Sequence, residues 1–396
     1  MQIKDMVVAA AVLVTGCLST PPYKPEDGVS FTETGTGVPG SRGATVAAPG
    51  FELHFADGDV FHFPDTLKID GTDVLGHDAT SACFGQNELG FLIAPTSRIS
   101  ADGGANVVTN RLEPVLRGPA VVQVKLTWAT QLTCSAERKP SGTATFTVFP
   151  DGRIVRFDTM ADPSSASIAA STCSCGAMDQ QFNVITFWTF AGAGFRTLYA
   201  PDNKVLPLPT ANLVANYETS CIADMAHQVA LAWRVSKDTE LSSSPALLRF
   251  GRTLSDVGTS VLDSYSYENH SAIFIERLHG DTGCAAASVR AEEFVTPPHL
   301  FANDSEVRLG SDGIYGGTDG GLLPGLPVSG RVALTGPVKS SFAVWLRFPN
   351  AVDALDVTLE GATGSWYLPQ RVDDTSWIVW VRAGLAPGQT IAIEPR

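Results

Sequence analysis

Apolar and polar residues alternate with a period of two along most of this chain, a pattern that predicts β-strands. The clearest run is 122–132, where Val124, Leu126 and Trp128 share one face and Lys125 lies on the other. Shorter runs of the same kind predict further strands at 144–148, 154–157 and 229–235. Strands with one apolar and one polar face are typical of antiparallel sheets that are packed on one side only.

The first strong alternation, at 51–55, predicts one arm of a hairpin that returns through Phe63. A three-residue loop keeps the apolar residues together by placing Leu53 opposite Phe63. The same register places His54 opposite His62 on the polar face. Two opposed imidazoles could hold a transition metal, but we interpret them as a solvent-facing or inter-sheet pair and assign no metal.

A Gly- and Asp-rich stretch at 301–330 predicts a linker, and a second series of short alternating runs follows it. Their spacing is typical of a small β-sandwich. We therefore predict an all-β fold, with a large antiparallel β-sandwich at 50–300 and a small C-terminal β-sandwich at 331–396. The single helical candidate, 245–262, is weakened by its two glycines.

Composition agrees with a β-rich chain and narrows the range of partners. Charged residues make up 17% of the sequence, whereas about 25% is usual for soluble domains. The 37 glycines and 25 prolines suit strands and turns. Because the formal net charge is −14 and no basic cluster stands out, we expect no nucleic-acid partner.

The first seventeen residues have the layout of an export signal. Lys4 precedes an apolar run at 6–14, which is too short to span a bilayer as a helix, and Val14-Thr15-Gly16-Cys17 closes the segment. These last residues resemble the lipobox of bacterial lipoproteins. The resemblance implies removal of residues 1–16, acylation of the Cys17 sulfur with a fatty acid such as palmitate, and a membrane as partner.

Residues 17–49 are rich in Pro, Gly and Thr without apolar periodicity, which predicts a flexible tether. Leu18 stands where enterobacterial lipoproteins retained at the inner membrane carry aspartate. The resemblance therefore implies a location at the outer membrane of a Gram-negative bacterium.

Six further cysteines predict up to three disulfides in an exported chain. They are Cys83, Cys134, Cys173, Cys175, Cys221 and Cys284. Cys173 and Cys175 are too close to bridge each other without strain, so each is expected to reach a distant partner. We expect Cys83 to pair with Cys134. A Cys-x-Cys metal site is the alternative, which an oxidising compartment disfavours.

The densest polar and aromatic cluster contains Tyr265, Tyr267 and His270. Such side chains could stack on sugar rings, or act as acid or base in β-elimination beside a uronate carboxylate. In an eliminating enzyme an arginine, Arg249 or Arg277, would neutralise that carboxylate. The competing interpretation is a strand whose tyrosines edge the core.

Two weaker candidates lie in the C-terminal third. Asp312 and Asp319 could hold a structural Ca²⁺, although loop carboxylates are usually only solvated, and we expect no other cofactor. Trp366 and Tyr367 follow a turn, so one of the two rings should face outward and could stack on a ligand. Packing at an edge strand is the alternative for this pair.

Two short stretches, Phe149-Pro150-Asp151-Gly152-Arg153-Ile154 and Gly388-Gln389-Thr390-Ile391, resemble β-sandwich domains of bacterial carbohydrate-active proteins. Together with the lipobox, the resemblance implies a lipid-anchored cell-envelope protein with a binding or structural role and glycan as a candidate ligand. Two alternatives remain open, a polysaccharide-cleaving enzyme of the lyase type and a docking subunit of an envelope complex. The sequence does not decide whether the protein is an enzyme.

Overall fold

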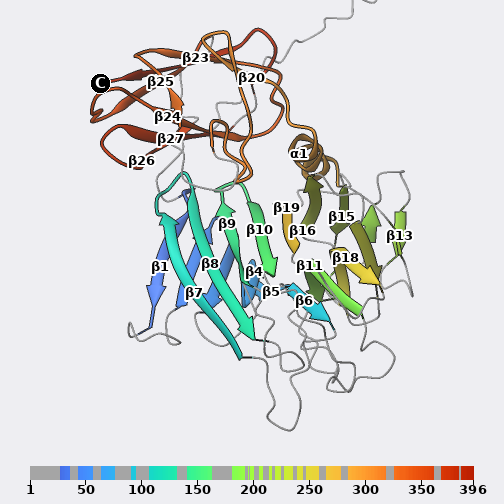
Figure 1. The fold of residues 1–396 in the computed structure, drawn as a ribbon. Helices are drawn as coiled ribbons and strands as arrows, with labels where there is room; N and C mark the ends of the chain where they lie inside the picture. The colour runs from blue at the N-terminus through green and yellow to red at the C-terminus, as the bar shows by residue number, and fades with distance from the viewer. Residues whose placement is uncertain are drawn as a thin grey trace, which may run out of the picture.

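In a computed structural model, most of the described residues lie in β-strands and few in helices, which confirms the predicted all-β fold (Figure 1). The structure describes residues 27–35, 43–56, 64–75, 91–94, 107–131, 141–162, 181–191, 195, 197–199, 205–207, 214–215, 219–223, 227–234, 239–243, 247–257, 265–277, 284–317, 325–360, 367–382 and 385–396. No helix within these ranges is long and apolar enough to cross a membrane.

The largest sheet has nine strands, and all its neighbouring pairs are antiparallel. In sheet order they are β13 (Val205–Pro207), β12 (Thr197–Tyr199), β15 (Thr219–Ala223), β16 (His227–Arg234), β19 (Tyr265–Arg277), β10 (Arg153–Asp162), β9 (Ser141–Val148), β8 (Val122–Gln131) and β7 (Val107–Leu116). The predicted strands at 122–132, 144–148, 154–157 and 229–235 are confirmed as β8, β9, β10 and β16.

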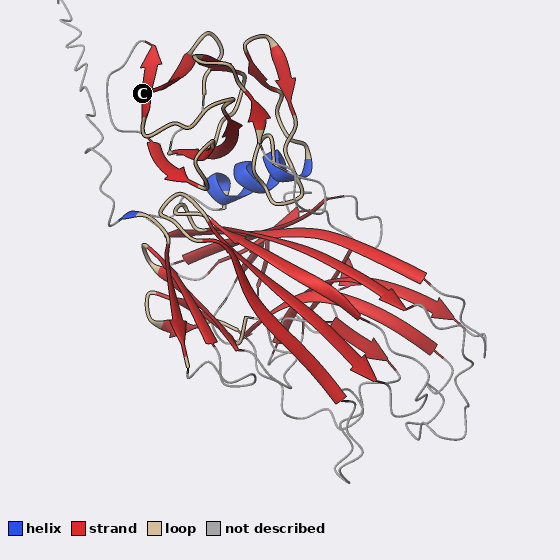
Figure 2. Ribbon diagram, turned by 60° about the vertical axis from the view of Figure 1, so that its left-hand side comes forward, coloured by secondary structure: helices blue, strands red, loops and turns tan. Residues whose placement is uncertain are grey.

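Two five-stranded sheets form the facing layer of the large sandwich (Figure 2). One contains β1 (Ser30–Thr34), β2 (Gly43–Ala48), β3 (Phe51–Ala56), β4 (Thr66–Ile69) and β5 (Thr72–Asp73). The other contains β14 (Val214–Ala215), β17 (Thr239–Ser243), β18 (Leu247–Val257), β11 (Gln181–Ala191) and β6 (Phe91–Ala94). A bridge between Leu75 and Phe190 joins these two sheets. The core between the layers includes Phe55 and Phe146, whose ring centroids lie 5.2 Å apart.

The C-terminal unit is a smaller sandwich of two sheets around its own core. The first sheet contains β21 (Ser305–Val307), β20 (Leu300–Ala302), β23 (Val332–Thr335), β28 (Thr390–Pro395) and β25 (Leu355–Glu360). The second contains β22 (Leu326–Pro327), β24 (Phe342–Arg347), β27 (Ser376–Val381) and β26 (Tyr367–Arg371). The predicted linker at 301–330 is wrong over β20 and β21, because these strands, with buried Ile314 and Tyr315, belong to the folded unit.

Helix α1 (Ala285–Val295) lies between the two sandwiches (Figure 2). Its buried residues are spaced as one helical face: Ala287, Arg290, Ala291 and Phe294. This face packs on β15, β16 and β19 of the nine-stranded sheet. The weak helical candidate at 245–262 is not a helix over 247–257, because those residues form β18, which pairs with β11 and β17.

The N-terminal part of the fold begins earlier than the sequence predicted. Strands β1 and β2 lie within the expected tether, and both pair into the sheet of β3, so the tether prediction is wrong there. The chain enters the fold beside the loop between β7 and β8, where the Val29 N–H donates to the Pro119 carbonyl at 2.9 Å. In the same loop, the Val121 N–H donates to Gln370 Oε1 of β26 at 2.8 Å.

The predicted register of the first hairpin is also wrong. Strand β3 pairs with β4 so that Leu53 lies opposite Leu67 and His54 lies opposite Thr66. The predicted partner of His54 was His62, which lies outside the described residues. In the observed register Thr66 takes that position on β4.

One disulfide joins β15 to the start of α1. Cys221 and Cys284 are bonded, with their Cα atoms 6.1 Å apart, which confirms both as disulfide cysteines. The predicted pairing scheme is wrong in one respect. If Cys83 were bonded to Cys134, the distant partners left for Cys173 and Cys175 would be Cys221 and Cys284. These two cysteines are instead bonded to each other. The other four cysteines lie outside the described residues.

Candidate functional site

The nine-stranded sheet has two faces with different neighbours. Its inner face packs on the facing layer through residues such as Trp128 and Ile154. One half of the outer face carries small and apolar side chains, including Val155 and Ala272, which are buried under α1 and the C-terminal sandwich. The long strands then run out from beneath α1 (Figure 2), and this second half of the outer face has a different chemistry.

Backbone pairing aligns the outer side chains of this second half into two rows that cross five strands. The first row, from β19 to β7, is Glu268, Thr159, Thr143, Thr127 and Arg111. The second row, in the same order, is His270, Phe157, Thr145, Lys125 and Glu113. Directly paired residues of antiparallel strands share a face. We call these ten residues the outer polar face.

Exposure on this half of the sheet rises with distance from the C-terminal sandwich. The row that adjoins the sandwich is at most 8% exposed, and its members are Gln123, Thr147, Val155 and Ala272. In the second row Phe157 is 8% exposed, and Lys125 and His270 are half-buried. In the first row Thr143 and Thr159 are half-buried, and Thr127 and Glu268 are exposed. The outer polar face therefore begins where the cover of the C-terminal sandwich ends.

Hydroxyl and ring contacts order the centre of the outer polar face. Thr143 Oγ1 and Thr159 Oγ1 lie 2.9 Å apart in a hydrogen bond. One hydroxyl proton and several lone pairs of this threonine pair are then left for a ligand. The rings of Phe157 and His270 lie 4.5 Å apart at an interplanar angle of 53°. The centre can therefore exchange hydrogen bonds and also offers part of an aromatic surface.

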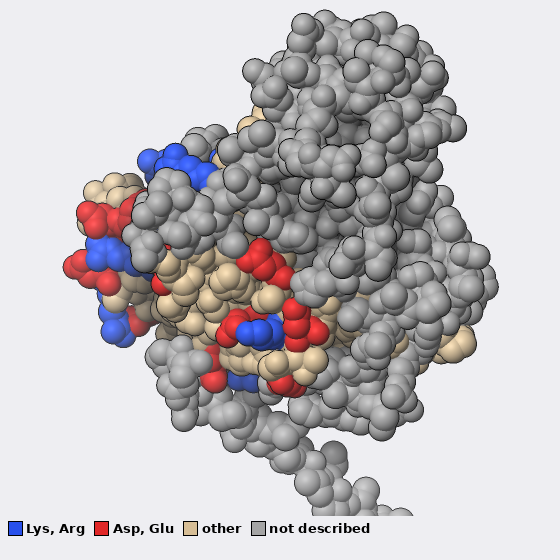
Figure 3. All heavy atoms as spheres, turned by 90° about the horizontal axis from the view of Figure 1, so that it is seen from below, with Lys and Arg blue, Asp and Glu red and all other residues tan. Residues whose placement is uncertain are grey.

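The charges on the outer polar face balance each other. Arg111 and Lys125 stand against Glu113 and Glu268. Acidic and basic side chains also lie beside one another on the described part of the molecule's lower surface (Figure 3). A balanced face suits an uncharged ligand better than a polyanion, which needs a concentration of positive charge.

A buried charge pair lies on the inner face, behind the two rows. Arg156 Nε donates to Asp158 Oδ1 at 2.8 Å, and both side chains are fully buried. Asn269 Nδ2 donates to Asp158 Oδ2 at 3.1 Å, which ties β10 to β19. Burial raises the pKa of Asp158, and Arg156 opposes that rise. These hydrogen bonds fix the two strands that carry Phe157 and His270.

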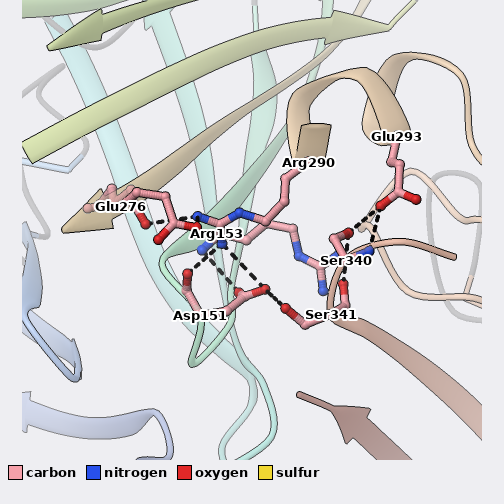
Figure 4. Close-up of polar contacts among 8 residues, drawn as sticks. Asp151, Arg153, Glu276, Arg290, Glu293, Ser340 and Ser341 are labelled. Carbon is pink, nitrogen blue, oxygen red and sulfur yellow. Dashed lines mark hydrogen bonds and ion pairs between the residues drawn. The ribbon is translucent and has the colours of Figure 1, made fainter. Parts of the chain in front are cut away.

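A second buried network joins the large sandwich, α1 and the C-terminal sandwich (Figure 4). Arg290 of α1 donates to the carbonyls of Asp151 and Ile275, at 2.6 and 3.0 Å. Its guanidinium also lies 2.6 Å from Glu276 Oε1 and 3.6 Å from Asp151 Oδ2. One helical side chain thus connects the turn before β10 to the end of β19.

The C-terminal sandwich joins this network through residues 339–341. Ser341 Oγ donates to Asp151 Oδ2 at 2.6 Å. Glu293 of α1 accepts the backbone N–H groups of Lys339 and Ser340, at 2.6 and 3.0 Å (Figure 4). The three units are therefore fixed to one another by directional contacts as well as by apolar packing.

Arg153 lies in the same network with its guanidinium 3.8 Å from the centre of the Phe149 ring. Burial lowers the pKa of Arg153, and the nearby Asp151 opposes the change. The preceding turn is possible because Gly152 adopts a φ of +82°, and a Cβ there would come within 2.5 Å of the Ile275 carbonyl oxygen. We assign this network a structural role, since it lies at the junction and not on the open face.

The structure separates the residues of the predicted polar-aromatic cluster. His270 lies on the outer polar face, half-buried. Positions 265 and 267 differ from 270 by an odd number, so they do not share its face of β19, and the structure describes only their backbone. Of the two arginines considered for an eliminating enzyme, Arg277 pairs with His227 at the other end of β19, and Arg249 belongs to β18 of the facing layer. The structure therefore does not bring Tyr265 and Tyr267 onto the face that carries His270.

The weaker metal candidates have structural contacts. His54 Nδ1 lies 2.9 Å from Asp65 Oδ2. Asp312 is buried, and its Oδ1 accepts the Ile314 N–H at 3.0 Å, while Asp319 lies outside the described residues. Across the described ranges, no three His, Cys, Asp or Glu side chains are grouped so that they could hold a metal ion.

The proposed stacking pair in the C-terminal sandwich is described only in part. Tyr367 is half-buried and packs against the core of that sandwich, as the edge-strand interpretation expected. Trp366 lies outside the described residues, as does Cys17.

Sequence reasoning missed most of the outer polar face. The signal was present in the alternation of Thr143, Thr145 and Thr147 with apolar residues along β9. What the sequence did not show is that β8 and β10 place Thr127 and Thr159 beside them.

Comparisons with known proteins show similarity in fold alone. Neither a family model nor a curated protein matches the sequence. A galactose 1-epimerase from Lactobacillus acidophilus matches with a TM-score of 0.35 and 9% identity, over 63% of this chain and 99% of that one. A putative aldose 1-epimerase from Klebsiella pneumoniae matches with a TM-score of 0.42 and 8% identity, over 66% of this chain and 87% of that one.

A heparan sulfate lyase from Pedobacter heparinus matches with a TM-score of 0.35 and 10% identity, over 74% of this chain and 38% of that one. This chain therefore spans about two fifths of the lyase. At such identities no site residue is transferred from these proteins. The comparisons show that the chain has a weak structural resemblance to domains of carbohydrate-active proteins.

Proposed function

We propose that this protein binds a glycan on its outer polar face and does so at the surface of the cell envelope. The observation that carries the proposal is the pair of polar rows, in which hydroxyls, an imidazole and balanced charges cross five adjacent strands. Sugars present many hydroxyls and little charge, and a face with these groups can match them.

The rigidity of the face supports binding. Threonine side chains on paired strands have few rotamers, so little conformational entropy is lost when they hydrogen-bond to a ligand. The Thr143–Thr159 hydrogen bond and the buried Arg156–Asp158 pair further hold β9, β10 and β19 in place. The partly exposed His270 beside Phe157 can pack against the apolar side of a sugar ring.

Removing two hydroxyls tests this proposal. The double variant Thr127→Val/Thr143→Val is expected to bind the polysaccharide about tenfold more weakly, because a hydrogen bond contributes roughly 0.5–1.5 kcal/mol and two are lost. Affinity electrophoresis of residues 27–396 through gels that contain neutral plant and bacterial polysaccharides would identify the ligand and measure the change.

The matched control is Thr358→Val, which removes an exposed strand hydroxyl from the C-terminal sandwich and should leave the affinity unchanged. Two results would contradict the proposal: no retardation of the wild type in any gel, or equal retardation of the wild type and the double variant.

We also propose that a lipid on Cys17 attaches the protein to the membrane, at the outer membrane if the cell sorts lipoproteins by the residue after the cysteine. The support is the sequence Val14-Thr15-Gly16-Cys17. Cys17→Ala is expected to move the full-length protein from the membrane fraction to the soluble fraction, whereas Ser19→Ala should stay with the membrane. Equal membrane retention of Cys17→Ala and the wild type would refute the anchor.

Cleavage of the bound glycan is a second candidate function. His270 and Glu268 lie two positions apart on the same face of β19, so an acid or base and a carboxylate stand beside the proposed ligand. Assaying the same polysaccharides for new chain ends after incubation decides between binding and cleavage. If the protein binds another envelope protein and none of the glycans, the docking alternative is favoured.

A further inference from the structure

We propose that the ligand is a linear, uncharged polysaccharide that lies across the strands, with about one sugar ring over each of five strands. This inference rests on the proposed function and adds the shape, direction and charge of the ligand. Its basis is the register that aligns β19, β10, β9, β8 and β7.

The open area is longer across the strands than along them. Adjacent strands lie about 4.8 Å apart, so five strands span roughly 19 Å. Along the strands the two rows are about 7 Å apart. The next row toward the C-terminal sandwich is closed, because Thr147 is 1% and Val155 is 0% exposed. An elongated ligand therefore fits across the strands, with the C-terminal sandwich along one side of it.

The polar groups repeat at the strand spacing. Each of the three central strands contributes one threonine to the first row: Thr127, Thr143 and Thr159. A linear polysaccharide presents a set of hydroxyls on every ring, and the length of a sugar ring along the chain is close to the distance between strands. The same hydrogen bond can then recur from strand to strand. A compact or branched ligand does not present hydroxyls at this regular spacing and cannot form the repeated contact.

Charge is confined to the two sides of the face. Arg111, Glu113 and Lys125 lie on β7 and β8, and Glu268 lies on β19. Strands β9 and β10 contribute threonines and Phe157 only. Lys125 of β8 lies directly opposite Glu113 of β7, so a uronate or sulfate over the centre would lose its hydration without gaining an unopposed cation. The occupant of the centre is therefore uncharged.

The test measures affinity against chain length. Cello-, xylo- and manno-oligosaccharides of two to eight sugars are titrated by calorimetry, with polygalacturonate as the anionic comparison. We expect the affinity to rise with each added sugar up to about five and then to stay level, because five strands contribute contacts. Arg111→Ala, at the β7 side, is expected to weaken binding of a six-sugar chain several-fold and to leave that of a three-sugar chain unchanged. Thr143→Val, at the centre, should weaken both.

The outcomes separate this inference from the proposed function. An affinity that is already level at two sugars, or an equal effect of Arg111→Ala on short and long chains, overturns the orientation and leaves glycan binding intact. Preference for polygalacturonate overturns the uncharged ligand. Failure of every oligosaccharide and polysaccharide to bind overturns both the inference and the proposed function.

Discussion

Replacing Arg290 by methionine is expected to lower the free energy of unfolding by about 3–5 kcal/mol, the usual effect of removing one partner from a buried ion pair. Arg290 is 7% exposed and donates to two backbone carbonyls as well as contacting Asp151 and Glu276. Methionine keeps much of the apolar volume over Phe274, so the loss reports the polar contacts. Urea unfolding followed by tryptophan fluorescence measures it.

Arg331→Met is the matched control for this measurement. Arg331 Nε lies 3.3 Å from Glu394 Oε1, and both side chains are about half exposed, at 54% and 52%. An exposed pair of this kind contributes about 1 kcal/mol or less. If Arg290→Met and Arg331→Met shift the unfolding midpoint equally, the junction network does not hold the sandwiches together as described.

Removal of the Cys221–Cys284 disulfide is expected to have an effect of similar size. The bond closes a loop with a sequence separation of 63 residues, and chain entropy alone predicts a loss of about 4 kcal/mol for a loop of that length. The Cys221→Ala/Cys284→Ala variant isolates this bond without reducing any other. Its unfolding free energy, compared with that of the wild type, gives the contribution.

Ser288→Ala serves as the control for that experiment, because Ser288 is a half-buried residue of the same helix with no disulfide. A loss below about 1 kcal/mol in the double cysteine variant would mean that the packing of α1 on β15 and β16 fixes the helix without the bond. Because Arg290 and Cys284 both hold α1, the effects of removing them should not add.

Strands were predictable from the sequence, whereas their partners were not. Alternation of side chains is a local property, so β8, β9 and β10 could be placed from their own residues. The partner of β3 depends on which strand returns beside it, and the structure brings back β4 and not the segment through Phe63. A local pattern gives the same expectation for both pairings, and tertiary packing decides between them.

Helix α1 illustrates a different failure. Its buried face is spaced correctly for a helix, but it consists of two alanines, one phenylalanine and Arg290, so an apolar stripe was not evident. The arginine is buried because Asp151 and Glu276, both far from it in the sequence, meet it at the junction. In contrast, the weak helical candidate at 245–262 contains β18, whose residues pair with β11.

The candidate site shows the same limit. Threonines were visible in single strands, but the outer polar face exists because β19, more than a hundred residues after β10, pairs beside it. Tyr265 and Tyr267, which the sequence places near His270, do not share its face of β19, since residues along a strand alternate between two faces.

The entry of the chain at Val29, beside Pro119, has a consequence for the orientation of the molecule. Only ten residue steps separate Cys17 from Asp27, where the described fold begins, and ten extended residues reach at most about 35 Å. With a lipid on Cys17, this short linker would hold the β7–β8 loop and the adjoining C-terminal sandwich toward the bilayer. The two polar rows would then lie farther from the lipid than the β7–β8 loop does, because they stand further along β7 and β8 from that loop.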